Sequence, residues 1–181
     1  MHDDIARILL SSEQIAARVE EMGRAIAADL DRADPARGIV LVPVMTGAII
    51  FVADLVRHLP QKLRIQVATV SSYPGTSVAS QGAAIVGSLP ADLAGRHVLI
   101  VDDILDSGQT LTLLREEITA RGAASVRCAV LLRKQRPQAM ATTCEHIGFD
   151  IPDEFVVGYG LDYDDHYRNL PFVGTLKEEA R

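Results

Sequence analysis

Residues 98–110 have the sequence VLIVDDILDSGQT, and this stretch decides the fold. An apolar run begins at Val98 and leads directly into two adjacent carboxylates, Asp102 and Asp103. Such a run predicts a buried strand of a parallel sheet. The carboxyl end of that strand would place both carboxylates at the edge where open α/β sheets bind their ligands.

A short polar turn follows the expected strand. Asp106 adds a third carboxylate, and the next residues are Ser107, Gly108, Gln109 and Thr110. The turn offers backbone N–H groups and two hydroxyls ahead of an expected helix, which is an arrangement that binds anions. Acidic groups beside an anion site indicate a ligand that carries both hydroxyls and phosphate, such as a phosphosugar.

The rest of the chain alternates between apolar runs and helical periods. Strands are expected at residues 39–44, 63–70, 98–101 and 126–132, and helices at 12–30, 47–58 and 111–121. A further short strand is expected at 83–86, inside an irregular stretch, and another at 155–157, followed mostly by loop. Ser11 and Gln14 fit a capping box at the start of the first helix. This alternation implies an α/β fold with a parallel sheet and right-handed crossovers.

Length and composition limit the class of protein. A chain of 181 residues with 48% hydrophobic residues predicts one globular domain. The net charge of −6 argues against a nucleic-acid partner, which needs a basic face. The longest apolar stretch, 38–53, is interrupted by Pro43 and Gly47, so no membrane span is expected. An acidic start without a basic leader region, and two cysteines without metal-binding spacing, predict a reduced cytoplasmic protein.

Residues 98–110 closely resemble the phosphoribosyl-pyrophosphate (PRPP) signature of the type I phosphoribosyltransferases. The aspartate at position 106 is most similar to the hypoxanthine-guanine branch of that family. A second block, FVVGYGLDY at 155–163 followed by YRNLP at 167–171, resembles the C-terminal block of the same branch. The resemblance spans nearly all of 38–175. It implies a single domain over 1–181, with a parallel-sheet core at about 36–135 flanked by helices and a small hood from about 1–35 and 136–181.

The resemblance also implies roles for the first block. The family reaction joins N9 of a purine to C1 of PRPP and releases pyrophosphate, with Mg²⁺ as cofactor. Asp102 and Asp103 would contact the ribose hydroxyls and the metal, and the turn over 107–110 would bind the 5′-phosphate. Asp106 would exchange a proton with the purine N7 as a general acid or base. Many family members carry Glu where this chain has Asp102, which shortens the reach of the carboxylate by one methylene.

The second block would bind the base. By the same resemblance Lys134 donates to the 6-oxo group of the purine, which favours hypoxanthine, guanine or xanthine over adenine. Phe155 would stack on the purine, and backbone groups of Val156 would meet its edge. Asp162 would contact a Mg²⁺ ion, and Arg168 would lie near pyrophosphate. Without the resemblance, Lys134 is an ordinary solvated end of a strand, and an aromatic such as Phe155 belongs to a core.

Two further segments match functional loops of the family. Thr46 and Gly47 fall in the loop whose backbone amides meet pyrophosphate, but the hypoxanthine-guanine branch usually has Lys where this chain has Thr46. Backbone amides must therefore carry more of the pyrophosphate binding. Ser72 and Tyr73 match the mobile loop that closes over the site and excludes water.

Three alternatives remain open from the sequence. The chain fits another phosphoribosyltransferase that uses xanthine, adenine or a pyrimidine. It also fits a non-enzymatic regulator of this fold that binds RNA, although no basic stripe supports one. An aspartate-dependent phosphatase is the third. The expected partners are PRPP and a purine base, with no nucleic acid and no membrane, and the family resemblance predicts a homodimer or homotetramer.

Overall fold

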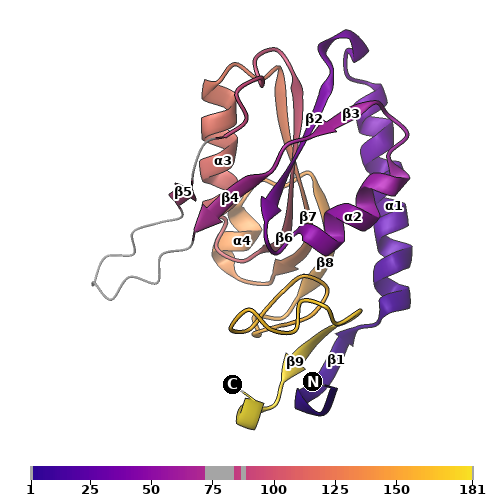
Figure 1. The fold of residues 1–181 in the computed structure, drawn as a ribbon, viewed down its shortest axis with the longest axis vertical. Coiled ribbons are helices and arrows are strands. Elements are labelled where there is room, and N and C mark those ends of the chain that lie inside the picture. Colours follow the sequence, from indigo (N-terminus) through magenta and orange to yellow (C-terminus); the bar gives the residue numbers. More distant parts are fainter. Residues whose placement is uncertain (1, 72–83, 87–88, 181) are drawn as a thin grey trace.

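The computed structural model describes residues 2–71, 84–86 and 89–180 (Figure 1). Its described strands are β1 Ile5–Leu10, β2 Ile39–Met45, β3 Leu63–Ile65, β4 Ala68–Ser71, β5 Ala84–Val86, β6 His97–Leu105, β7 Ser125–Lys134, β8 His146–Ile151 and β9 Val173–Leu176. The α-helices are α1 Ser12–Asp31, α2 Ile49–Leu55, α3 Gln109–Ala120 and α4 Pro137–Ala141, and short 3₁₀ helices cover His2–Asp4, Pro35–Arg37, Val56–His58 and Glu178–Ala180.

A mostly parallel sheet forms the centre of the molecule, with the order β5-β4-β2-β6-β7-β8 and with β3 also paired to β2. Within this sheet the described strands β2, β3, β4, β6, β7 and β8 pair in parallel, and β5 pairs antiparallel with β4. The α/β class predicted from the sequence is therefore confirmed. Strand β6 lies inside this sheet and is bonded to β2 on one side and β7 on the other.

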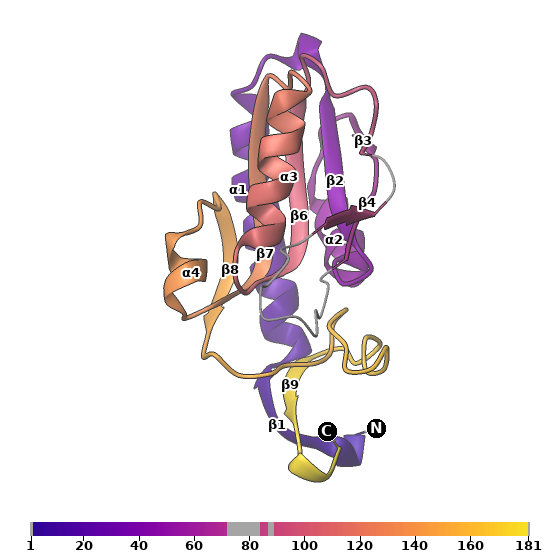
Figure 2. The same ribbon diagram turned by 90° about the vertical axis from the view of Figure 1, so that its left-hand side faces the viewer.

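Helices cover both faces of the sheet, and this coverage explains the apolar run of β6. Leu99 and Val101 pack with α1 and α2 on one face, whereas Val98 and Ile100 pack with α3 on the other. Figures 1 and 2 show α1 and α3 on opposite sides of the strands. A strand that is buried on both faces has no polar side to alternate with, so its sequence is a continuous apolar run.

Helix α1 follows the amphipathic period of its sequence. The capping box at its start is present: the Gln14 backbone N–H donates to the Ser11 hydroxyl, and the Ser11 N–H donates to the Gln14 side chain. The apolar residues at spacings of three and four are buried against the sheet: Ile15, Val19, Met22, Ile26 and Leu30. Gly23 allows close packing, since a Cβ there would lie 2.4 Å from the Cβ of His58.

Several element boundaries differ from the sequence expectation. Strand β6 runs on to Leu105, so Asp102 and Asp103 lie within the strand and not beyond its end. The strand expected at 63–70 is interrupted at residues 66–67, which divides it into β3 and β4, and both pair parallel with β2 in the same register. The helix expected at 111–121 begins at Gln109.

The C-terminal third was predicted least well. The strand expected at 155–157 is absent, and only Val157 forms an isolated bridge, to Gly174. Strand β8 and helix α4 were missed; β8 joins the main sheet beside β7, although its sequence HIGFDI has no continuous apolar run. The predicted division into core and hood stays a prediction. Helix α1 and strand β8 fall in the hood by those boundaries, but α1 packs against the main sheet and β8 pairs with β7 within it.

A small second layer closes the carboxyl end of the sheet. Strands β1 and β9 form an antiparallel pair there, next to the loop over 152–172 (Figure 1). The loop is fixed to α2, because the Tyr159 hydroxyl donates to Asp54 over 2.6 Å. Burial of the hydroxyl, followed by this bond to a carboxylate, raises the pKa of Tyr159. No helix in the described part of the chain is long and apolar enough to span a membrane.

The packing predicts which side chain of α2 carries stability. Phe51 is fully buried between the sheet and the helices, so Phe51→Ala should lower the free energy of unfolding by about 3–5 kcal/mol. Ile49, on the same helix, is 43% exposed, so Ile49→Ala should cost less than about 1 kcal/mol. Urea denaturation measures both losses, and equal losses would contradict the packing described here.

Candidate functional site

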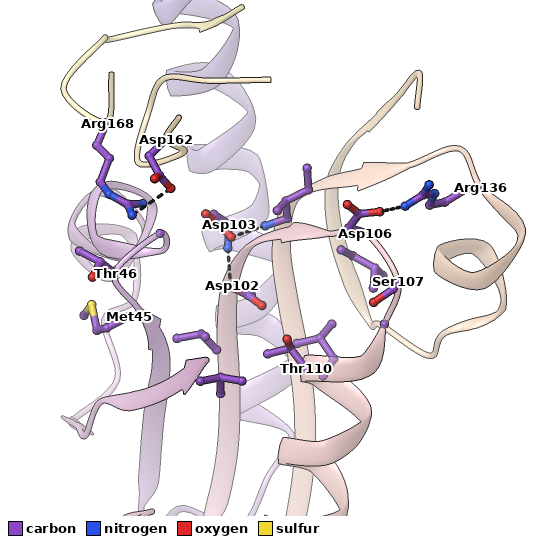
Figure 3. Close-up of a pocket in the computed structure, with 17 residues that line it drawn as sticks. Met45, Thr46, Asp102, Asp103, Asp106, Ser107, Thr110, Arg136, Asp162 and Arg168 are labelled. Carbon is purple, nitrogen blue, oxygen red and sulfur yellow. Dashed lines mark hydrogen bonds and ion pairs between the residues drawn. The ribbon is translucent and has the colours of Figure 1, made fainter. Parts of the chain in front are cut away.

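A cavity of about 490 Å³ opens at the carboxyl end of β2 and β6, where the sequence placed the ligand. Figure 3 shows Asp102 and Asp103 at its centre. Thr46, Asp162 and Arg168 lie on one side, and Asp106, Ser107 and Arg136 lie on the other. The lining therefore comes from the loop after β2, the end of β6, the start of α3 and the C-terminal loop.

Asp102 and Asp103 are held by the backbone of their own strand. The Asp103 N–H donates to the Asp102 carboxylate over 3.0 Å, and the Ile104 N–H donates to the Asp103 carboxylate over 2.7 Å. Burial raises the pKa of Asp102 well above its ordinary value, and the neighbouring Asp103 charge adds to this. Burial also raises the pKa of Asp103, while the nearby Arg168 charge acts in the opposite direction. Two carboxylates that are costly to ionise therefore face the cavity.

The loop after β2 contacts Asp103 directly. A Cβ at Gly47 would lie 1.9 Å from the Asp103 carboxylate, so only glycine leaves room for it. The peptide bond between Met45 and Thr46 is cis. On the other side of the loop, a Cβ at Gly160 would lie 2.2 Å from the Gly47 carbonyl oxygen. The three segments that carry Gly47, Asp103 and Gly160 thus meet in close contact.

The turn after β6 forms the opposite wall. Gly108 adopts φ +80° as the N-cap of α3, and the Thr112 N–H donates to its carbonyl oxygen. Ser107, Gly108 and Thr110 line the cavity, whereas Gln109 is exposed and is not part of the lining. This wall presents the first turn of a twelve-residue helix, where free N–H groups favour an anion.

Asp106 is paired with two cations. Lys134, the last residue of β7, donates to one of its oxygens over 3.1 Å, and Arg136 donates to the other. The sequence predicted Lys134 as a site residue but did not single out Arg136. Arg136 lines the large cavity and also pairs with Asp153, which was likewise missed. No sequence motif identifies Arg136 and Asp153, because they and Asp106 lie in three different loops.

A second, smaller cavity of about 210 Å³ adjoins the first. The predicted base-binding residues line it: Lys134, Phe155, Val156 and Asp162. Phe155 is 44% exposed and meets the ring of Tyr163 edge to face, with centroids 5.6 Å apart. Asp103 and Asp106 line both cavities, so a ligand that fills both would pass between these carboxylates.

Asp162 and Arg168 lie together across the cavity from Asp106. The Arg168 guanidinium pairs with the Asp162 carboxylate over 2.9 Å and donates to the Gly160 carbonyl oxygen over 2.8 Å. The structure thus brings together every predicted site residue among the described ones except Gln109. Ser72 and Tyr73, the predicted mobile loop, lie outside the described residues.

The residues present fit a divalent cation that is shared with a substrate. Within the described ranges, no group of three or more His, Cys, Asp or Glu side chains is arranged to hold an ion. Mg²⁺, however, is usually bound through one or two carboxylates plus substrate oxygens. Asp102 and Asp103 supply such carboxylates, and a cation would stabilise the charge that burial makes unfavourable.

Comparisons with known proteins agree with this geometry. The family described as "Phosphoribosyl transferase domain" matches residues 11–164. The hypoxanthine-guanine phosphoribosyltransferase of Mycobacterium tuberculosis is 45% identical over 178 residues, covering 96% of this chain and 87% of that protein. That of Streptococcus pneumoniae is 40% identical and covers 99% and 98%. A crystal structure of a Staphylococcus aureus hypoxanthine phosphoribosyltransferase superposes with a TM-score of 0.89 at 36% identity, covering 99% and 95%.

The contact between Gly47 and Asp103 generates a prediction about binding. In Gly47→Ala the new methyl group must displace the end of the Asp103 side chain, which can move without unfolding the protein. The variant should still fold, with its free energy of unfolding lowered by about 1–3 kcal/mol, since an extra methyl group in a filled site costs about that much. Its affinity for PRPP with Mg²⁺ should fall by about tenfold or more, as expected when a charged contact is lost. Unchanged affinity in calorimetric titration would show that Asp103 does not contact the ligand.

Proposed function

Because the chain belongs to the phosphoribosyltransferase family, we propose that it transfers the 5-phosphoribosyl group of PRPP to a 6-oxopurine. The products would be pyrophosphate and a nucleoside 5′-monophosphate, formed from hypoxanthine or guanine in purine salvage. The observation that carries this proposal is the pair of adjoining cavities that share Asp103 and Asp106. One has the carboxylates and N–H groups that a phosphosugar needs, and the other has an aromatic ring and a lysine for a base.

Residues around the large cavity would bind PRPP. Asp102 and Asp103 would accept hydrogen bonds from the ribose hydroxyls, and the N–H groups at the start of α3 would bind the 5′-phosphate. The backbone of Thr46 and Gly47, with Arg168, would bind pyrophosphate. Asp102 and Asp103, and separately Asp162, would contact Mg²⁺, which would neutralise charge on the leaving pyrophosphate.

Residues around the small cavity would orient the base. Phe155 would stack on the purine, the Val156 backbone would meet its edge, and Lys134 would donate to O6. The bond from N9 to C1 would form as the bond from C1 to pyrophosphate breaks, and Asp106 would exchange a proton with N7. Positioning and exclusion of water account for the rate, with no covalent intermediate on the protein.

The same observations bear on the alternatives. Lys134 lies at the small cavity with an ammonium donor, which favours an oxo group over the amino group of adenine. A preference among hypoxanthine, guanine and xanthine depends on the exocyclic pocket near Val156 and Asp162. We also propose a homodimer or homotetramer, a cytoplasmic location and a single domain over 1–181, with the core and hood boundaries given above.

A pyrophosphate-release assay tests the proposed function. With PRPP and Mg²⁺, hypoxanthine and guanine should be turned over while adenine and uracil are not. Asp106→Asn should lower kcat by about 10²–10⁴-fold, because it removes general acid–base catalysis at N7. Asp150→Asn is the matched control, since the side chains of both aspartates are 42% exposed and both are paired with arginine. No turnover of any base by folded protein that binds PRPP would refute the enzyme and favour the regulator.

A further inference from the structure

A closed ring of four charges lies at the border of the two cavities. Asp106 pairs with Lys134 and Arg136, and Asp153 pairs with the same two cations. The Lys134 ammonium is 3.1 Å from an Asp106 oxygen and 3.6 Å from an Asp153 oxygen. The Arg136 guanidinium is 3.0 Å from the other Asp153 oxygen. Two negative and two positive charges alternate around the ring, so no member faces an unbalanced charge.

The ring is built from three separate places in the fold. Asp106 follows β6, Lys134 ends β7, and Asp153 follows β8, while Arg136 is the N-cap of α4. The backbone fixes the two basic residues relative to β8, because the Gln135 N–H donates to the Ile151 carbonyl oxygen over 2.8 Å. The ring thus links the ends of three neighbouring parallel strands.

Lys134 is the member most dependent on its neighbours. Its side chain is only 12% exposed, and a buried ammonium is stable only when it is paired. An ammonium has three N–H donors. One of them is donated to Asp106, and Asp153, at 3.6 Å, attracts the ammonium as an ion pair, so donors remain for a ligand in the small cavity that Lys134 lines.

Asp106 is constrained in the same way. Each of its carboxylate oxygens faces one cation, with Lys134 on Oδ2 and Arg136 on Oδ1. When a purine base approaches the Asp106 oxygen that faces Lys134, Arg136 still pairs with the other oxygen and keeps the Asp106 carboxylate from rotating away. Asp153 at the same moment remains as the carboxylate partner of Lys134.

We propose that Asp153, acting with Arg136, positions Lys134 and Asp106 for the O6 and N7 edge of a 6-oxopurine. This inference rests on the proposed function and deepens it by naming the residues that set base selectivity. Asp153 lines neither cavity, so it acts through Lys134 and is a positioning residue.

The test compares Asp153→Asn with Asp150→Asn. Asp150 also belongs to the β8 region, its side chain is likewise 42% exposed, and it forms a two-bond ion pair with Arg133 outside both cavities. The substrates are hypoxanthine and PRPP, and unsubstituted purine is measured as a competitive inhibitor against hypoxanthine. Purine has N7 and N9 but no 6-oxo group, so it makes no bond to Lys134.

In Asp153→Asn the KM for hypoxanthine should rise by about tenfold, as expected for weakening of one hydrogen bond from a charged group. The KM for PRPP and the inhibition constant of purine should change by less than about twofold, which is within the ordinary effect of a surface substitution. Asp150→Asn should match the wild type in all three measurements.

Two results would overturn the inference. In Asp153→Asn, equal weakening of hypoxanthine binding and purine binding would show that Asp153 does not position Lys134. Kinetic constants of Asp153→Asn that equal those of Asp150→Asn would show the same. A wild-type protein that turns over no base would refute the proposed function first and this inference with it. Activity of the wild type on hypoxanthine therefore separates the two failures.

Discussion

Burial of the carboxylates at the end of β6 is the constraint on which the site depends. Strand β6 is covered on both faces and bonded to β2 as far as Val101 and to β7 as far as Leu105, so Asp102 at its end is buried and Asp103 is partly buried. Two carboxylates in that position are costly to ionise, and a ligand that brings positive charge or hydroxyl donors offsets this cost. The fold therefore places two carboxylates that favour a ligand at the end of an inner strand of the sheet.

The surrounding loops are shaped by the same two side chains. Gly47 has no Cβ because Asp103 takes the space, and Gly160 has none because the Gly47 carbonyl takes it. Arg168 contributes positive charge near Asp103 while it remains paired to Asp162. The backbone of the loop after β2 is therefore positioned by close packing and not by a charged side chain at position 46.

The sequence predicted those parts of the structure that local physics determines. The continuous apolar run before Asp102 follows from the burial of β6 on both faces. The helical spacing of apolar residues in α1 follows from its burial on one face, and both predictions were confirmed. Strand β8 escaped prediction because Gly148 and two polar residues interrupt its apolar pattern, although pairing with β7 still holds it in the sheet. Arg136 and Asp153 escaped for another reason. Their partners lie on other strands, and no spacing along the chain records an ion pair formed across three loops.

Asp102 and Asp103 should bind a phosphosugar together with a divalent cation. The first measurement is a calorimetric titration of PRPP into the wild-type protein, with and without Mg²⁺, alongside Asp103→Asn. We expect saturable binding that is strong with Mg²⁺, weak without it, and weak in the variant under both conditions. Binding of equal strength in all of these titrations would show that the buried carboxylates have no part in holding the ligand.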